Sequence, residues 1–263
     1  MRTGLMMEFD SEQGIEYLRV LLNGSVSVAA IVFVGHQGSP KADRLLQERT
    51  GGLYMKPSLS KVLSGTKIPA YFVDDVNSPE CLNTLAGLGL DLLVAQSSRI
   101  IRLPIFDVPK YGILNCHTAI LPYMRGCSCL EWSIYNDQPM GATCHFMVRK
   151  VDAGPIVSQS LLKYRAGDTY ETIRTKMIYL MATIMGDSVA KIASGKAARS
   201  PEESALKGPW FSPMRDPEAV QVVKDKLLGS TYNPTPFPNH RSLEITDVDI
   251  SAHAWSDDAV GSS

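Results

Sequence analysis

The stretch Thr3–Val34 reads TGLMMEFDSEQGIEYLRVLLNGSVSVAAIVFV and decides the fold. Its two ends, residues 3–8 and 27–34, are short apolar runs typical of buried strands. Between them, apolar residues recur at helical spacing after Asp10 or Ser11, either of which suits the N-cap of a helix. A strand, a helix and a second strand in this order predict a βαβ unit with parallel strands.

The same alternation continues beyond this unit. We expect further strands near residues 69–73, 91–96 and 111–117, and a helix over 77–88. Two more extended runs, 142–148 and 156–162, are joined by so short a connection that an antiparallel or bent pairing is expected between them. The predicted fold class is therefore α/β: a Rossmann-like, mostly parallel, twisted sheet with helices on both faces.

A change in composition near residue 196 divides the chain. A long helix, with Asp168 as its N-cap and Glu171 closing a capping box, is expected to end around Gly195. Seven of the 16 prolines then fall within residues 200–240, around one expected helix, Asp216 to Leu228. We therefore expect a catalytic domain over 1–195 and a short, irregular, Pro-rich accessory tail over 196–263, its last eight or so residues disordered.

Charge and hydropathy exclude several classes of protein. The 263 residues include 26 Lys and Arg against 27 Asp and Glu, which lacks the basic excess expected of a nucleic-acid-binding protein. The longest apolar run, residues 28–35, is far shorter than the roughly 20 residues of a membrane-spanning helix. The N-terminus does not fit a secretory signal. We expect a cytoplasmic protein with reduced cysteines and with neither nucleic acid nor membrane as partner.

Asn115 and His117 carry the first chemical signal. Alternate residues of a strand face the same way, so both side chains project together from the carboxyl end of a central strand, where open α/β sheets bind ligands. Cys116 points to the opposite face, and the alternation places no Ser or Cys nucleophile beside them. Asp152 follows in the loop Val151-Asp-Ala-Gly-Pro155. A histidine at the end of a strand is by itself more often structural.

An amide, an imidazole and a carboxylate that converge on one point suit acyl transfer. The amide and a protonated imidazole can hold an oxyanion, while the carboxylate raises the pKa of the imidazole and moves a proton. The motifs that surround these residues read NCHTAILPYMRG over 115–126, WSI over 132–134, GATCHFM over 141–147 and VDAGPI over 151–156. In order and spacing they resemble the folate-dependent formyltransferase family, closely over about residues 68–195 and more loosely before that.

The resemblance implies an enzyme that moves a formyl group from 10-formyltetrahydrofolate, its co-substrate, to an amine. Its catalytic residues would be Asn115, His117 and Asp152. The first two would stabilise the tetrahedral oxyanion, and the third would help the amine proton to reach N10 of the folate. The residues expected to bind the folate are Ser98, Arg99, Ile101, Met147 and Val148. The apolar members of this set also fit plain core packing.

The sequence departs from the family pattern in places that concern the substrate. Thr118 and Ala119 stand where the family usually has Pro and Ser, and Met124 stands where it often has an aromatic residue. Arg149 and Lys150 give a positive charge to a loop that is often acidic in the family. This loop suits an anionic substrate, the glutamate tail of the folate or, more simply, a solvated surface.

Two observations narrow the expected acceptor. The loop over residues 7–13 carries Glu8, Asp10 and Glu12, which would repel a phosphate, and this argues against a phosphoribosylglycinamide formyltransferase. The tail is too short and Pro-rich for the additional barrel of the methionyl-tRNA formyltransferases. A small-molecule amine remains as substrate, with a nucleotide-linked amino sugar or an amine of secondary metabolism as the leading candidates.

Other functions stay open at this point. A formyltetrahydrofolate hydrolase would use the same three residues, and a non-catalytic folate-binding protein would keep the sheet and lose the site. A metal site built from His117, Cys127 and Cys129 has no evident fourth ligand, so no metal is expected. The aromatic residues of the tail fit a wall of the substrate site, a homodimer contact or, more simply, an arm packed on the core. They are Trp210, Phe211, Tyr232 and Phe237.

Overall fold

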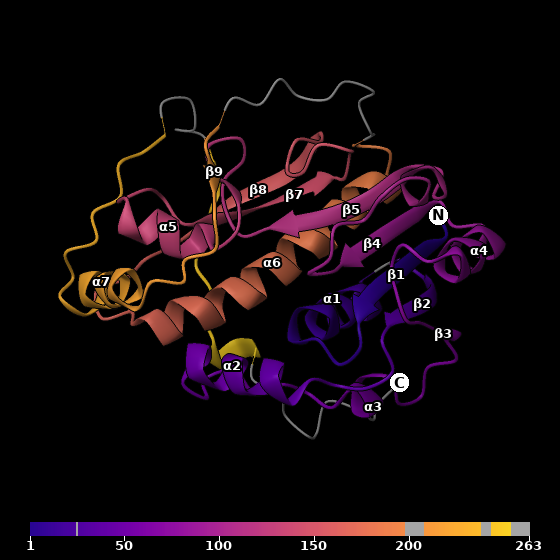
Figure 1. The fold of residues 1–263 in the computed structure, drawn as a ribbon, viewed down its shortest axis with the longest axis horizontal. Helices are drawn as coiled ribbons and strands as arrows, with labels where there is room; N and C mark the ends of the chain where they lie inside the picture. The colour runs from indigo at the N-terminus through magenta and orange to yellow at the C-terminus, as the bar shows by residue number, and fades with distance from the viewer. Residues whose placement is uncertain (25, 198–207, 238–242, 254–263) are drawn as a thin grey trace.

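The computed structural model describes residues 1–263 except 25, 198–207, 238–242 and 254–263 (Figure 1). Within the described residues the main sheet has eight strands in the order β10-β8-β7-β5-β4-β1-β2-β3. Their bounds are β1 (Thr3–Glu8), β2 (Val28–Val34), β3 (Ala70–Val73), β4 (Leu92–Gln96), β5 (Gly112–His117), β7 (Gly141–Phe146), β8 (Ile156–Leu162) and β10 (Ile245–Thr246). Strands β1 to β5 are parallel, and β7 is antiparallel to both its neighbours. The predicted α/β class and the antiparallel pairing of β7 with β8 are confirmed.

Helices cover both faces of the sheet. They are α1 (Glu12–Asn23), α2 (Pro40–Thr50), α3 (Leu59–Val62), α4 (Pro79–Leu88), α5 (Cys129–Tyr135), α6 (Tyr170–Ala193) and α7 (Pro217–Leu228). The long helix α6 crosses beneath β5, β7 and β8 and packs against α1 (Figure 1). Helix α4 packs on the opposite face. None of the helices in the described ranges is long and apolar enough to cross a membrane.

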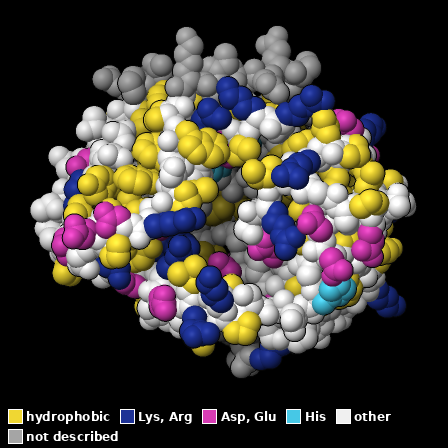
Figure 2. Space-filling view, in the orientation of Figure 1, with side chains coloured by type: hydrophobic (Ala, Val, Ile, Leu, Met, Phe, Trp, Pro, Cys, Tyr) yellow, Lys and Arg dark blue, Asp and Glu magenta, His cyan; other side chains and the backbone are white. Residues whose placement is uncertain are grey.

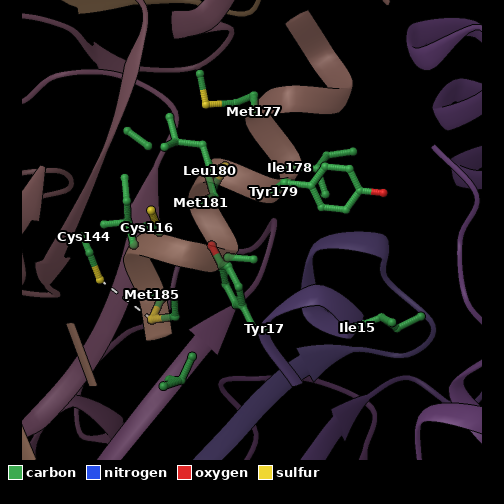
Figure 3. Close-up of a cluster of buried hydrophobic side chains, with 14 of the residues drawn as sticks. Ile15, Tyr17, Cys116, Cys144, Met177, Ile178, Tyr179, Leu180, Met181 and Met185 are labelled. Atoms are coloured by element: carbon green, nitrogen blue, oxygen red, sulfur yellow. Dashed lines mark hydrogen bonds between the residues drawn. The ribbon is translucent and has the colours of Figure 1, made fainter. Parts of the chain in front are cut away.

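The alternation of side chains along each strand explains the two cores. Leu5 and Met7 of β1 belong to the core beneath α1 and α6, whereas Met6 between them belongs to the core beneath α4. Figure 3 shows part of the first core, where Cys144 of β7 lies 3.8 Å from Met185 of α6, Sγ to Sδ. Two adjacent dry cores are what a sheet covered on both faces requires.

Local signals set the helix ends, and one of them differs from the prediction. Ser11 begins α1, its Oγ accepting a hydrogen bond from the Gly14 amide at 3.2 Å. The N-cap of α6 is Thr169, and the prediction of Asp168 was wrong. Asp168 instead accepts two hydrogen bonds from the buried Lys176, at 2.7 and 2.8 Å. A buried ammonium requires that carboxylate, so the neighbouring hydroxyl takes the capping role.

The C-terminal tail contains more regular structure than its composition indicated. Its helix α7 begins after Asp216, as predicted, and packs on α5. Strand β10 extends the main sheet at its edge, and β9 (Trp210–Phe211) pairs in parallel with β6 (Arg125–Gly126) in a separate two-stranded sheet. These two-residue strands carry no periodic signal that sequence could reveal. The final eight residues, which we expected to be disordered, lie outside the described residues.

Candidate active site

The pairing of β5 with β7 gathers polar side chains at one end of the sheet. Asn115 lies opposite His145 in this antiparallel ladder, and His117 lies opposite Thr143. Directly opposed residues share a face, so Asn115, His117 and His145 project from the same side of the sheet. The Asn115 Nδ2 and His145 Nε2 atoms are 3.4 Å apart.

Asp152 reaches this cluster from the loop between β7 and β8. The loop closes tightly, since the Phe146 amide donates to the Pro155 carbonyl at 2.9 Å. A Cβ on Gly154 would lie 1.7 Å from the Phe146 oxygen, so only glycine fits there. Asp152 has a left-handed backbone, with φ of 55°, and its Oδ2 accepts a hydrogen bond from the Gly126 amide at 2.9 Å. The loop thus holds this carboxylate in a conformation that a non-glycine residue rarely adopts.

The three predicted catalytic residues come together, and a second histidine joins them. Asp152 Oδ1 lies 3.8 Å from His117 Nδ1 and 3.9 Å from His145 Nε2. The exposed fractions are 7% for His117, 2% for His145 and 8% for Asp152, so all three groups are largely withdrawn from water. Charges interact more strongly at such a site than on the surface.

Backbone carbonyls fix which nitrogen of each imidazole carries hydrogen. His117 Nε2 lies 3.0 Å from the Met124 oxygen, and His145 Nδ1 lies 3.0 Å from the Phe146 oxygen. Because a carbonyl only accepts, each of these nitrogens donates. Nδ1 of His117 is therefore the ring nitrogen that faces Asp152.

His145 is held in its neutral form. Its pKa is lowered from 6.5 to about 4. Burial is the largest cause and the neighbouring His117 acts in the same direction, while Asp152 and the hydrogen bond to the Phe146 oxygen oppose them. At neutral pH its Nε2 keeps a lone pair and accepts a hydrogen bond from the Asn115 amide nitrogen. This bond fixes the orientation of the Asn115 side chain.

A cavity of about 240 Å³ lies beside this cluster. Asn115, His145 and Asp152 line it, while His117 does not belong to its lining. All five residues expected at the folate line the same cavity: Ser98, Arg99, Ile101, Met147 and Val148. Figure 2 shows the face of the molecule hollowed near its centre, with hydrophobic and basic side chains around the hollow.

A larger cavity, of about 310 Å³, lies between the tail and strand β8 and shares no lining residue with the first. Its lining is mainly apolar and prolyl, with Lys163 as its one charged side chain among the described residues. Chemistry at a carbonyl requires several convergent polar groups, so the smaller cavity is the candidate active site. The described residues form no group of three His, Cys, Asp or Glu side chains that could hold a metal ion.

The negative charge of the loop after β1 is partly compensated by a basic residue from elsewhere in the chain. Glu8 accepts a hydrogen bond from the Ser98 amide at 2.9 Å, which ties this loop to the wall of the cavity. Asp10 pairs with Lys56 at 2.7 Å, and the same ammonium pairs with Asp43 at 2.6 Å. Lys56 thus offsets part of the negative charge that we expected to repel a phosphate.

His145 is the site residue that sequence reasoning did not select. It lies in the motif GATCHFM, at the start of the loop that the family resemblance places at the folate pocket, but that resemblance gives its imidazole no catalytic task. The signal that could have found it is the register of β5 against β7, because His145 falls opposite Asn115. Alternation alone places a residue on a face, and only pairing shows which residue it meets.

A mostly parallel α/β sheet in which β5, β7 and the loop after β7 bring an amide, two imidazoles and a carboxylate together beside a cavity is the arrangement of an enzyme of the acyl-transfer class. Comparison with known families makes this specific. The formyl transferase family model matches residues 22–186, more than half of the chain, and the chain belongs to that family. Its domain is that of a formyl-transferring enzyme, and enzymes of the family take formyltetrahydrofolate as co-substrate.

The chain spans only part of the length of the curated relatives that it matches. It is 32% identical over 132 residues to the bifunctional polymyxin resistance protein ArnA of Wigglesworthia glossinidia brevipalpis, covering 49% of this chain and 20% of that protein. The methionyl-tRNA formyltransferases that follow are matched over 48 to 68% of their own length.

Two solved structures share the fold. Glycinamide ribonucleotide transformylase 1 of Symbiobacterium toebii aligns with a TM-score of 0.60 and 20% identity, over 76% of this chain and 91% of that one. A sugar N-formyltransferase of Shewanella sp. FDAARGOS_354 aligns with a TM-score of 0.58 and 15% identity, over 91% of this chain and 94% of that one. At these identities the likeness concerns the fold alone.

Proposed function

We propose that the protein is an N-formyltransferase that moves the formyl group of 10-formyltetrahydrofolate to the amine of a small molecule. The observation that carries the proposal is the convergence of Asn115, His145 and Asp152 at one cavity, with His117 next to Asp152 just outside its lining. The wall of this cavity also holds the five residues expected at the folate. Catalysis is assigned to residues 1–195, with the tail as an accessory segment.

The residues of the cavity fit the co-substrate. Ile101, Phe106 and Met147 give one part of its wall an apolar surface, which suits a flat heterocycle. Arg99 and Arg149 line the cavity as well, and guanidinium groups suit the carboxylates of a glutamate tail. When bound, the co-substrate supplies an activated formyl group.

Each polar side chain then has a defined task. Asn115, oriented by His145, donates an amide hydrogen to the oxyanion that develops on the formyl oxygen. His117 in its protonated form donates from Nδ1 to the same oxygen, and the Asp152 carboxylate stabilises that imidazolium. Asp152 also accepts the proton that the attacking amine releases. This proton passes to N10 of the folate as the bond between N10 and the formyl carbon breaks and tetrahydrofolate leaves.

The acceptor we favour is a nucleotide-linked amino sugar. Glu8 and Asp10 lie at the end of β1, where a phosphate-binding loop would be required for a phosphoribosylglycinamide acceptor. The fold is shared with a sugar N-formyltransferase and with a glycinamide ribonucleotide transformylase alike, so the choice rests on these carboxylates. The pairing of Lys56 with Asp10 keeps the phosphoribosylglycinamide acceptor as the second candidate.

Turnover assays test the proposal. The protein is incubated with 10-formyltetrahydrofolate and a panel of amines that includes nucleotide-linked amino sugars and phosphoribosylglycinamide, and release of tetrahydrofolate is followed. Formylation of an amino sugar is the expected result. Formate release without any amine would instead show a hydrolase, and no reaction with any amine would overturn the proposal.

A further inference from the structure

The tail reaches the candidate active site through strand β9. Trp210 pairs with Arg125 of β6, and Phe211 pairs with Gly126. Backbone hydrogen bonds flank the pair, from the Arg125 amide to the Pro209 carbonyl at 3.3 Å and from the Cys127 amide to the Phe211 carbonyl at 3.0 Å. Strand β9, unlike β6, lies outside the residues that the family model matches.

Both residues of β6 in turn hold the loop that carries Asp152. The Gly126 amide donates to the Asp152 carboxylate at 2.9 Å, and the Arg125 guanidinium donates to the Val151 carbonyl at 2.9 Å. A Cβ on Gly126 would lie 2.2 Å from the Phe211 oxygen, so the two strands approach as closely as glycine allows. The tail, β6 and the Asp152 loop therefore form one connected unit.

The side chain of Trp210 forms part of the cavity wall. Its ring centroid lies 5.8 Å from the guanidinium carbon of Arg125, which is itself only 8% exposed. Trp210 nevertheless remains 54% exposed, and it lines the cavity together with Asn115 and Asp152. An indole that contacts a buried cation and still remains exposed at the cavity wall is a preformed contact surface for a ligand ring.

We propose that Trp210 is the acceptor-binding wall of the active site and that the ring of the acceptor stacks on its indole. The partner is a ring with an apolar face, as a pyranose presents. The folate is expected on Ser98 to Ile101 and on Met147 and Val148, which leaves the Trp210 wall, next to Asp152, for the amine. This inference rests on the proposed function and deepens it.

Steady-state kinetics of two Trp210 variants test it with nucleotide-linked amino sugars. Trp210→Ala is expected to raise the KM for the amino sugar by about tenfold or more, with the KM for 10-formyltetrahydrofolate unchanged. Trp210→Phe keeps an aromatic face and is expected to retain most of the affinity. A fall in kcat at an unchanged acceptor KM would show that the residue only supports the Asp152 loop, and would overturn the proposal.

Trp132→Phe is the matched control. The Trp132 indole donates to the Ser212 carbonyl at 2.8 Å, so it fixes the tail without lining the cavity. Its acceptor KM should stay within about twofold of wild type. An equal rise of the acceptor KM in Trp210→Ala and in Trp132→Phe would show that the effect comes from a loosened tail, and it would overturn the proposed role of Trp210.

Calorimetric titration with the same amino sugars separates this inference from the proposed function. Binding that weakens about tenfold in Trp210→Ala supports the wall even if the wild-type protein formylates none of these sugars, in which case only the proposed function fails. If wild-type protein binds none of them, or if both Trp210 variants bind as wild type does, the inference is wrong.

Discussion

The two faces of the β5–β7 pair differ in chemistry, although successive residues of each strand point alternately to one face and to the other. One face is polar and the other is apolar. Asn115 and His145 meet on one face, beside the cavity. Cys116 and Cys144, the next residues on each strand, meet on the other face, in the dry core against α6. One ladder therefore fixes the chemistry of the site and the packing that supports it, and substitutions on its two faces should separate activity from stability.

The largest expected effect belongs to the polar face. Asp152→Asn keeps an oxygen that can accept from the Gly126 amide but removes the negative charge beside His117. His117→Asn removes the imidazole that faces Asp152. Each change should lower kcat by about 10²–10³-fold or more, since oxyanion stabilisation and proton transfer are lost. Steady-state assays with the acceptor that the turnover panel identifies measure the loss.

Folding and ligand binding provide the control for these two variants. Their urea unfolding midpoints and their affinity for 5-formyltetrahydrofolate should stay close to wild type, because neither side chain belongs to the hydrophobic core. Normal kcat in either variant contradicts the assigned roles. Loss of folding together with activity would mean that the polar face is structural.

Substitutions on the apolar face of the β5–β7 pair should lower stability and leave kcat nearly unchanged. Met185 is fully buried in α6 and contacts Cys144. Met185→Ala leaves a cavity under the strand pair and should lower the free energy of unfolding by about 2–5 kcal/mol. The kcat of the folded fraction should remain close to wild type. Urea denaturation and activity per folded molecule are the measurements, and a large fall in kcat would show that the two faces are coupled.

The sequence predicts which residues of one strand share a face, but it does not predict which residues of the two strands meet. Alternation within a strand is a local property, so it was enough to place Asn115 and His117 together and Cys116 apart. The encounter with His145 depends on the register of a strand some thirty residues away, which no local pattern encodes.

The tail shows the same limit. Its helix could be predicted from Asp216 and the apolar spacing that follows. Strand β9 could not be predicted, because two residues have no period and their pairing with β6 is decided by tertiary contacts. For the same reason Trp210 could be assigned no single role from sequence.

Acid should weaken the protein through His145, a group on the polar face. Its pKa is about 4 in the folded state against 6.5 in the unfolded chain, so the unfolded chain binds more protons between these values. The free energy of unfolding should therefore fall as the pH drops from 6.5, by about 3 kcal/mol at pH 4 and below. His145→Asn removes this contribution. Denaturation curves of both proteins at several pH values measure the difference, and identical pH slopes would contradict it.

The smallest effect on stability and activity is expected for Cys116, which lies between the site residues Asn115 and His117. Cys116 lies directly between Asn115 and His117 in sequence, yet its side chain is buried on the opposite face. Cys116→Ala removes one sulfur atom from the core and should destabilise the fold by about 1 kcal/mol. Its kcat should stay within about twofold of wild type, because the ladder that orients its neighbours is made by the backbone. A loss of activity comparable to that of His117→Asn would show that the core face sets the geometry of the site.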